Sequence, residues 1–185
     1  MSLSRFFLSL GVICIVFALV LLWQRNNPAR LNFAKAPQVE NSKVQGFRPV
    51  RITIPDAEIE LPIYPAKVEK NKWESTTQGV SWFAASAIPG ERGNSILYGH
   101  NWTNLLGNLA KVKVNQSIKI KFEDNKEKEF KVEKIAVVSP RDVRILNPTD
   151  DRRLTLYTCI GLFDGKRLVV IASPKNEISL QVKDL

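Results

Sequence analysis

The run SIKIKF at residues 117–122 alternates apolar and polar side chains, and a second alternating run, EFKVEKI, occupies residues 129–135. A period of two places successive side chains on opposite faces of a strand, which suits a sheet with one buried face. The polar segment EDNK, at residues 123–126, lies between the two runs and is rich in turn-forming residues. The two runs are therefore predicted to form a β-hairpin.

The rest of the sequence from residue 49 onward has the same character, with short runs bounded by turn residues. Further strands are predicted at residues 50–54, 58–63, 80–83, 95–98, 154–158 and 167–172. Helical patterns are short, at residues 102–110, where Asn101 or Thr103 could form the N-cap, and at residues 141–146. Many short strands with few helices predict a mainly β domain, built as a closed or nearly closed barrel or as a sandwich.

An apolar segment, FFLSLGVICIVFALVLLW, fills residues 6–23. Its length lies within the range of roughly 17–25 residues that a membrane-spanning helix needs. A cleaved signal peptide is the alternative, but it would have an apolar core of about 7–15 residues and a small-residue cleavage site, which this sequence lacks. We expect a short flank at residues 1–5, a transmembrane anchor at 6–23, a stalk at 24–48 and a folded domain at 49–185.

The net charge is +9, of which the four basic side chains of residues 1–39 contribute +4. In the domain, lysines alternate with acids, as in KEKE at residues 126–129, which favours a solvated surface near an anionic cell envelope over a nucleic-acid groove. The positive-inside rule taken alone would place the domain in the cytoplasm. A single N-terminal span ahead of a long domain is the ordinary export arrangement, so we expect a single-pass protein of the cell membrane with an extracellular domain.

Three residues at predicted strand ends have the chemistry of a thiol enzyme. Cys159 ends the run LTLYTC and is the one cysteine outside the apolar segment, His100 is the only histidine of the chain, and Arg167 begins the last predicted strand. A thiol nucleophile needs a proton-transfer partner and a stabiliser of developing negative charge. Taken singly, each residue also has a structural explanation, above all a buried thiol that packs as a small apolar side chain.

Several motifs in the domain resemble those of sortases. The run TLYTC at residues 155–159 resembles the T-L-x-T-C signature of that family, LYGH at 97–100 its histidine segment, and RLVV at 167–170 the strand that carries its arginine. The likeness extends over about residues 49–174, through ITIP at 52–55, VSW at 80–82 and PGERGN at 89–94. It implies a sortase-type closed β-barrel with a few short helices.

The resemblance also implies a reaction. Cys159 would be the nucleophile, His100 the acid and then the base, and Arg167 the group that holds the substrate or its oxyanion, with Thr158 as a weaker candidate for a substrate-binding hydroxyl. A sorting signal of the LPxTG type on a surface protein would be cleaved after its Thr through a thioacyl intermediate. An amine of a cell-wall peptide or a pilin would then accept the acyl group. No cofactor is expected.

Some alternatives stay open at this point. The lone N-terminal anchor resembles that of housekeeping or class D or E sortases, and the TLYTC run favours class D or E. The segment KVNQ at residues 113–116 departs from the Gly-Asp turn of many relatives. The hairpin acids Glu123, Asp124, Glu127 and Glu129 could bind calcium, as in some sortases, although their alternation with lysines favours a solvated hairpin. An L,D-type cysteine transpeptidase would need a Ser-x-Gly-Cys-x-Arg-like motif, which TCIG does not supply. A non-catalytic, membrane-tethered β-domain that binds envelope components would keep Cys159 as a structural residue.

Overall fold

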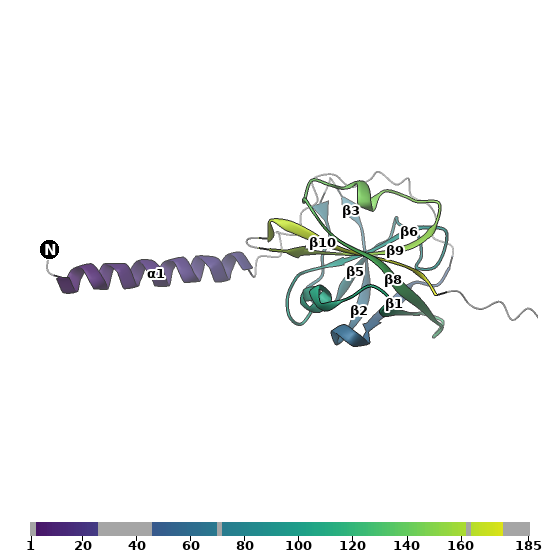
Figure 1. Ribbon diagram of the computed structural model, residues 1–185, viewed down its shortest axis with the longest axis horizontal. Helices are drawn as coiled ribbons and strands as arrows, with labels where there is room; N and C mark the ends of the chain where they lie inside the picture. The colour runs from purple at the N-terminus through teal and green to yellow at the C-terminus, as the bar shows by residue number, and fades with distance from the viewer. Residues whose placement is uncertain (1–2, 26–45, 70–71, 162–163, 176–185) are drawn as a thin grey trace, which may run out of the picture. The chain divides into compact units, whose positions relative to one another are not determined.

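A computed structural model describes residues 3–25, 46–69, 72–161 and 164–175 of the chain (Figure 1). The chain divides into two compact units, residues 1–30 and 31–185, which are described separately. Most of the predicted stalk, residues 26–45, and the last ten residues of the predicted domain lie outside the described residues.

The first unit contains one long helix, α1 (Leu3–Arg25). Within it, Ser4–Gln24 contains an 18-residue window with a mean hydropathy of 2.8. At a rise of 1.5 Å per residue, this segment is about as long as the hydrocarbon core of a bilayer is thick, roughly 30 Å. The predicted helix at residues 6–23 is confirmed as a helix, and its length and composition are those of a membrane span.

Among the described residues of the second unit, eight strands form a closed β-barrel (Figure 1). These strands are β1 (Pro49–Ile54), β2 (Ile59–Ala66), β5 (Val80–Phe83), β6 (Gly93–Gly99), β7 (Ser117–Phe122), β8 (Glu127–Val138), β9 (Arg152–Ile160) and β10 (Lys166–Pro174). Their order around the barrel is β1-β2-β5-β6-β9-β10-β8-β7, and the pairing of β1 with β7 closes it. The predicted mainly β, closed barrel is confirmed.

The predicted hairpin is present as β7 and β8, which pair antiparallel. Its turn is tight because Asn125 adopts a left-handed conformation with φ 64°, which asparagine tolerates better than most residues. Strand β8 begins two residues earlier than predicted and continues to Val138, and its residues from Phe130 to Val138 pair with β10. Two barrel contacts, β2 with β5 and β6 with β9, are parallel and were not predicted.

The predicted helices are shorter than the sequence indicated. The pattern at residues 102–110 gives a 3₁₀-helix, η3 (Leu106–Lys111), which has no side-chain cap, so the predicted cap at Asn101 or Thr103 is wrong. The pattern at 141–146 gives only η4 (Arg144–Leu146), and a further 3₁₀ turn, η2 (Pro55–Ala57), follows β1. Two short strands, β3 (Val68–Glu69) and β4 (Lys72–Trp73), form a small sheet of their own.

The side chains of the barrel strands form two apolar clusters on opposite faces of the sheet. The first fills the barrel interior and takes residues from all eight strands, for example Leu156 of β9 and Val170 of β10. The second lies on the outer face of β5, β6, β9 and β10 and includes Tyr98, Tyr157 and Cys159. The two-residue alternation of β9 therefore places Cys159 on the outer face, where a substrate can approach the sheet.

Candidate active site

Cys159 and Arg167 face each other across the last two strands. Strands β9 and β10 pair antiparallel, and the Cα of Cys159 is the direct partner of the Cα of Arg167. Directly opposed residues project to the same face of a sheet, with Cα atoms about 4.5–5.5 Å apart. The exposed fractions of the two residues are 3% and 5%. The antiparallel pairing expected for these strands is confirmed, and it brings thiol and guanidinium to one end of the barrel.

His100 approaches Cys159 from the other side of β9. Strand β6 runs parallel to β9, with Gly99 opposite Thr158, so His100 lies one residue beyond the ladder, level with Cys159. It follows Ile96 and Tyr98 of the outer-face cluster at the same two-residue spacing. Its exposed fraction is 4%. Strand β9 therefore lies between the strands that carry the other two candidate residues, so all three are neighbours at one barrel end.

Thr158 ties the end of β6 to β9. Its buried Oγ1 donates a hydrogen bond of 2.8 Å to the carbonyl oxygen of Gly99, the residue immediately before His100. Consecutive strand residues point to opposite faces, so the Thr158 side chain and the Cys159 thiol lie on opposite sides of the sheet. The hydroxyl has a partner within the protein, and a substrate-binding role for Thr158 stays a prediction.

Backbone carbonyls of the β9–β10 connection hold the Arg167 guanidinium. Its Nη1 donates to the Asp164 carbonyl at 2.7 Å and to the Lys166 carbonyl at 3.1 Å. Asp164 has a left-handed backbone with φ 56°, and its N–H donates to the Gly161 carbonyl at 3.2 Å. This turn presents the Asp164 carbonyl to the guanidinium, so the connection fixes the position of Arg167.

Burial and a nearby carboxylate shift the pKa of His100 in opposite directions. Burial disfavours the imidazolium and lowers the pKa of His100, whereas the negative charge of Asp164 acts to raise it. In the part of the chain that the structure describes, Nε2 of His100 is buried without a hydrogen-bond partner. Sequence reasoning missed Asp164, although the Asp164-Gly165 dipeptide is a turn signal that the described conformation bears out.

Two tyrosines form the outer face of the sheet next to the three candidate residues. Tyr98 of β6 is the register partner of Tyr157 of β9. Burial raises the pKa of Tyr157 to about 12 even though the Arg167 guanidinium acts in the opposite direction. Burial likewise raises the pKa of Tyr98, whose hydroxyl donates to the carbonyl of Glu74. Both phenols are therefore neutral near pH 7 and add no negative charge beside the thiol.

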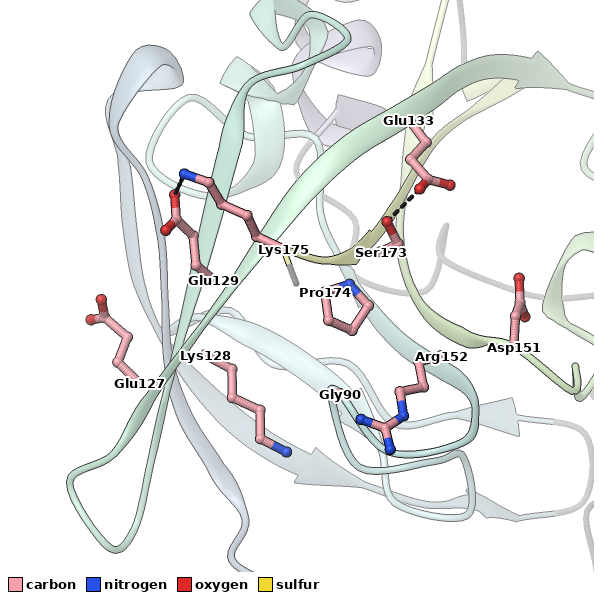
Figure 2. A pocket seen from close by; sticks show the side chains of 10 residues that line it. All are labelled: Gly90, Glu127, Lys128, Glu129, Glu133, Asp151, Arg152, Ser173, Pro174 and Lys175. Atoms are coloured by element: carbon pink, nitrogen blue, oxygen red, sulfur yellow. Dashed lines mark hydrogen bonds and ion pairs between the residues drawn. The ribbon is translucent and has the colours of Figure 1, made fainter. Parts of the chain in front are cut away.

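A hollow of about 1060 Å³ lies at the opposite end of the barrel, where β9 begins and β10 ends (Figure 2). Neither cysteine nor histidine lines it. Several of its polar and charged side chains have partners, such as Glu129 with Lys175 at 3.1 Å and Ser173 with Glu133. The hollow is therefore separate from the Cys159 site.

The hairpin acids considered for calcium have partners within the protein. Lys126 is 3.2 Å from Asp124, and Lys119 is 3.5 Å from Glu127. Glu123 accepts a hydrogen bond from the backbone N–H of Arg48. Among the described residues, no group of three or more His, Cys, Asp or Glu side chains could hold a metal ion. The contacts are those of a solvated hairpin, and calcium activation stays an untested alternative.

Comparisons with known proteins agree with the fold and the motifs. The model of the sortase domain matches residues 52–175. Sortase A of Bacillus anthracis is 27% identical over 125 residues, which cover 66% of this chain and 57% of that protein. Sortase A of Staphylococcus aureus is 29% identical over 153 residues, covering 75% of this chain and 70% of that protein. The chain belongs to the sortase family, whose members are cysteine transpeptidases.

A solved structure shows the same architecture. The lid mutant of Sortase A from Corynebacterium diphtheriae is 26% identical, covers 88% of this chain and 95% of that chain, and superposes with a TM-score of 0.60. The match to the Bacillus anthracis relative spans little more than half of that relative's length. Both curated relatives carry the name Sortase A, and the class D or E prediction stays a prediction.

Proposed function

We propose that this chain is a membrane-anchored sortase that cleaves an LPxTG-like sorting signal after its Thr and transfers the protein to an amine. The observation that carries the proposal is the alignment of three buried groups at one barrel end. Arg167 is the register partner of Cys159, and His100 follows the parallel strand on the other side. A thiol can serve as the nucleophile of acyl transfer through a thioester, an imidazole as its acid and base, and a guanidinium as the stabiliser of the oxyanion.

In the first step, the Cys159 thiolate attacks the carbonyl carbon of the signal's Thr and forms a C–S bond. The electrons of the C=O bond move to its oxygen, and the Arg167 guanidinium stabilises this charge as a forked, permanently charged donor. When the oxyanion collapses, the C–N bond to the next residue breaks. The His100 imidazolium gives its proton to the leaving amine, and a thioester on Cys159 remains.

In the second step, an acceptor amine attacks the thioester carbonyl. Neutral His100 takes the proton of that amine, the C–S bond breaks, and the Cys159 thiolate is released together with the new amide. A cell-wall peptide or a pilin lysine would supply the amine. Histidine serves in both directions because its ordinary pKa lies near the working pH.

The proposal places the reaction at the outer surface of the cell membrane. The helical segment Ser4–Gln24 is apolar and long enough to span a bilayer, which supports a single-pass anchor. The test of this part is protease treatment of intact cells that produce the chain. Loss of residues 49–185 from intact cells supports an extracellular domain, and protection until the membrane is broken would contradict it.

The reaction itself is tested with the full chain in detergent micelles, an LPxTG-type peptide and an added amine. Triglycine and an N-acetylated lysine ester represent the cell-wall and pilin acceptors. Mass spectrometry should find the peptide cut after Thr and joined to one of the amines. Cleavage at another bond only, or neither cleavage nor a joined product, would contradict the proposed reaction.

The low exposure of Cys159 favours one rival, a non-catalytic β-domain that binds envelope components. The thiol packs in the outer-face apolar cluster and is 3% exposed, as a structural cysteine would be. Thiol reactivity separates the two functions. A structural thiol resists alkylation in the folded protein, and its replacement weakens the fold. A catalytic thiol reacts with a peptide electrophile, and its replacement leaves the fold intact.

A further inference from the structure

Trp102 stacks on His100. The centroids of the indole and imidazole rings are 4.6 Å apart, and the ring planes differ by 14°. Trp102 is half-buried, so one side of the indole covers the imidazole while part of the side chain remains exposed. We propose that Trp102 is the positioning residue for His100, holding the imidazole in place and favouring its protonated form through contact with the indole face.

The segment after β6, which carries His100 and Trp102, is held in a tight turn by backbone hydrogen bonds. The carbonyl of His100 accepts a hydrogen bond of 3.1 Å from the N–H of Leu106. The carbonyl of Trp102 accepts two, from Leu105 at 2.9 Å and from Gly107 at 2.8 Å. Leu106 is fully buried in the barrel interior, so the turn is anchored to the core. The two stacked residues are therefore attached to a backbone segment that hydrogen bonds and the burial of Leu106 hold in place.

Gly107 makes this turn possible. A Cβ at this position would lie 2.6 Å from the carbonyl oxygen of Trp102, closer than real Cβ contacts allow. The missing side chain lets the backbone come close enough for the two hydrogen bonds to the Trp102 carbonyl. The sequence from His100 to Gly107 is thus adapted to hold the indole where it is.

The surroundings of His100 explain why such a contact has an effect. Among the described residues, the titratable or charged groups that face it from the neighbouring elements are Cys159 of β9, Arg167 of β10 and Asp164 of their connection. The neutral phenols of Tyr98 and Tyr157 lie on the same face. Burial disfavours the imidazolium. The indole is the aromatic face that attracts cations most strongly, so the stack offsets part of that penalty. Among the described residues Nε2 has no hydrogen-bond partner, so no hydrogen bond at that atom competes with the stack in orienting the ring.

This inference deepens the proposed function and rests on it, because it assigns Trp102 a part in the same proton transfers. The imidazolium must be present when the amine leaves, and its proton must point to the reacting atoms. An indole that favours the charged ring and fixes its plane serves both requirements. In the proposed role, Trp102 contacts neither the nucleophile nor the scissile bond, and it affects the reaction through the position and charge of His100.

The test follows the imidazole directly, since His100 is the only histidine of the chain. The full chain, labelled with ¹³C at histidine, is titrated by NMR in detergent micelles, so that its single imidazole signal needs no assignment. A Cys159→Ala background removes the coupled titration of the thiol. Trp102→Leu removes the aromatic face, Trp102→Phe keeps one, and Trp23→Leu in α1 is the matched control.

In Trp102→Leu, the titration midpoint of His100 should fall by about half a pH unit or more. Trp102→Phe should restore much of the difference, and Trp23→Leu should match the parent.

An unchanged midpoint in Trp102→Leu, with the fold intact by circular dichroism, would overturn the inference. Equal shifts in the Leu and Phe variants would also overturn it, because a loss of packing would then be the cause. If Trp102→Leu fails to fold, Trp102→Met is the second non-aromatic replacement, and a midpoint equal to that of the parent in Trp102→Met would contradict the inference.

The kinetic readout uses variants that keep Cys159. Trp102→Leu should lower kcat by about tenfold or more with little change in KM, and Trp102→Phe should recover most of the loss. A change confined to KM would assign Trp102 to substrate binding and contradict the inference. If the parent chain cleaves no sorting peptide while the NMR shift is present, the proposed function fails and the effect of Trp102 on His100 stands.

Discussion

Arg167 is bound to the connection that joins its own strand to that of Cys159, through two hydrogen bonds from Nη1 to the carbonyls of Asp164 and Lys166. A guanidinium has five donor hydrogens in a fixed fork. With Nη1 turned to the backbone, the rest of the fork can face the outer side of the sheet, where the Cys159 thiol lies. Arginine can therefore be anchored and reach a substrate oxygen at the same time.

Replacement of Arg167 by lysine should lower kcat by about 10²–10³-fold with the protein still folded. Lysine keeps the charge, but its single ammonium cannot hold the connection and the oxyanion together. Arg51→Lys is the matched control, since Arg51 pairs with Glu60 on exposed parts of β1 and β2. Peptide-cleavage rates measure both variants. A nearly normal rate for Arg167→Lys would mean that Arg167 is not at the reacting oxygen.

Asp164→Asn should lower the pKa of His100 further. The Asp164 carboxylate favours the imidazolium, and the amide removes that charge while leaving the backbone carbonyl that accepts from Arg167. Because the first step needs protonated His100, the alkaline limb of the rate profile should move to lower pH. Asp150→Asn, at an exposed residue near the other barrel end, should leave the profile unchanged. A profile that does not move in Asp164→Asn would show that this carboxylate does not act on His100.

Histidine burial should make folding stability rise with pH near neutrality. The pKa of His100 is lower in the folded protein than its ordinary value of 6.5, so the unfolded chain binds more protons between those two values. Stability therefore falls as pH drops through that interval and levels off below the folded pKa. Chemical denaturation of the parent and of His100→Gln at several pH values measures it. The same slope in His100→Gln would assign the effect to other groups.

Thr158→Val should destabilise the domain by about 1–3 kcal/mol, because it leaves the Gly99 carbonyl without its buried donor. The substitution should also reduce kcat, because Gly99 immediately precedes His100 and the lost hydrogen bond helps to position that backbone. Thr158→Ser keeps the hydroxyl and should stay closer to the parent in both respects. Denaturation midpoints and cleavage rates measure the pair. A Val variant that matches the parent while the Ser variant is impaired would show that the methyl group, and not the hydrogen bond, matters.

The sequence predicted the parts of the fold that depend on local alternation. The hairpin of β7 and β8 and the last two strands follow from period-two patterns, and their antiparallel pairing places Arg167 opposite Cys159. The helix predicted at residues 102–110 was wrong in type and start, because the contact of Gly107 with the Trp102 carbonyl produces a tight turn there. Such a contact between backbone segments leaves no periodic signal.

The candidate site could be predicted in so far as its residues lie at the ends of predicted strands. Cys159, His100 and Arg167 stood out by residue type and position, and the barrel brings these strand ends together. The stack of Trp102 on His100 and the charge of Asp164 beside the imidazole had no counterpart in the sequence reasoning. Both depend on how loops return over the barrel end, which propensity and periodicity do not determine.

The most direct test of the account is the intact mass of the full chain in detergent micelles after incubation with LPxTG-, LAxTG- and LPxTA-type peptides and no added amine. We predict a mass increase equal to the acyl fragment that ends in Thr, carried by the parent chain and absent from Cys159→Ala with an intact fold. The peptide that gives the largest adduct would identify the preferred signal. An adduct that persists in Cys159→Ala, or neither adduct nor cleavage with any of the three peptides, would contradict Cys159 as the nucleophile of a sortase reaction.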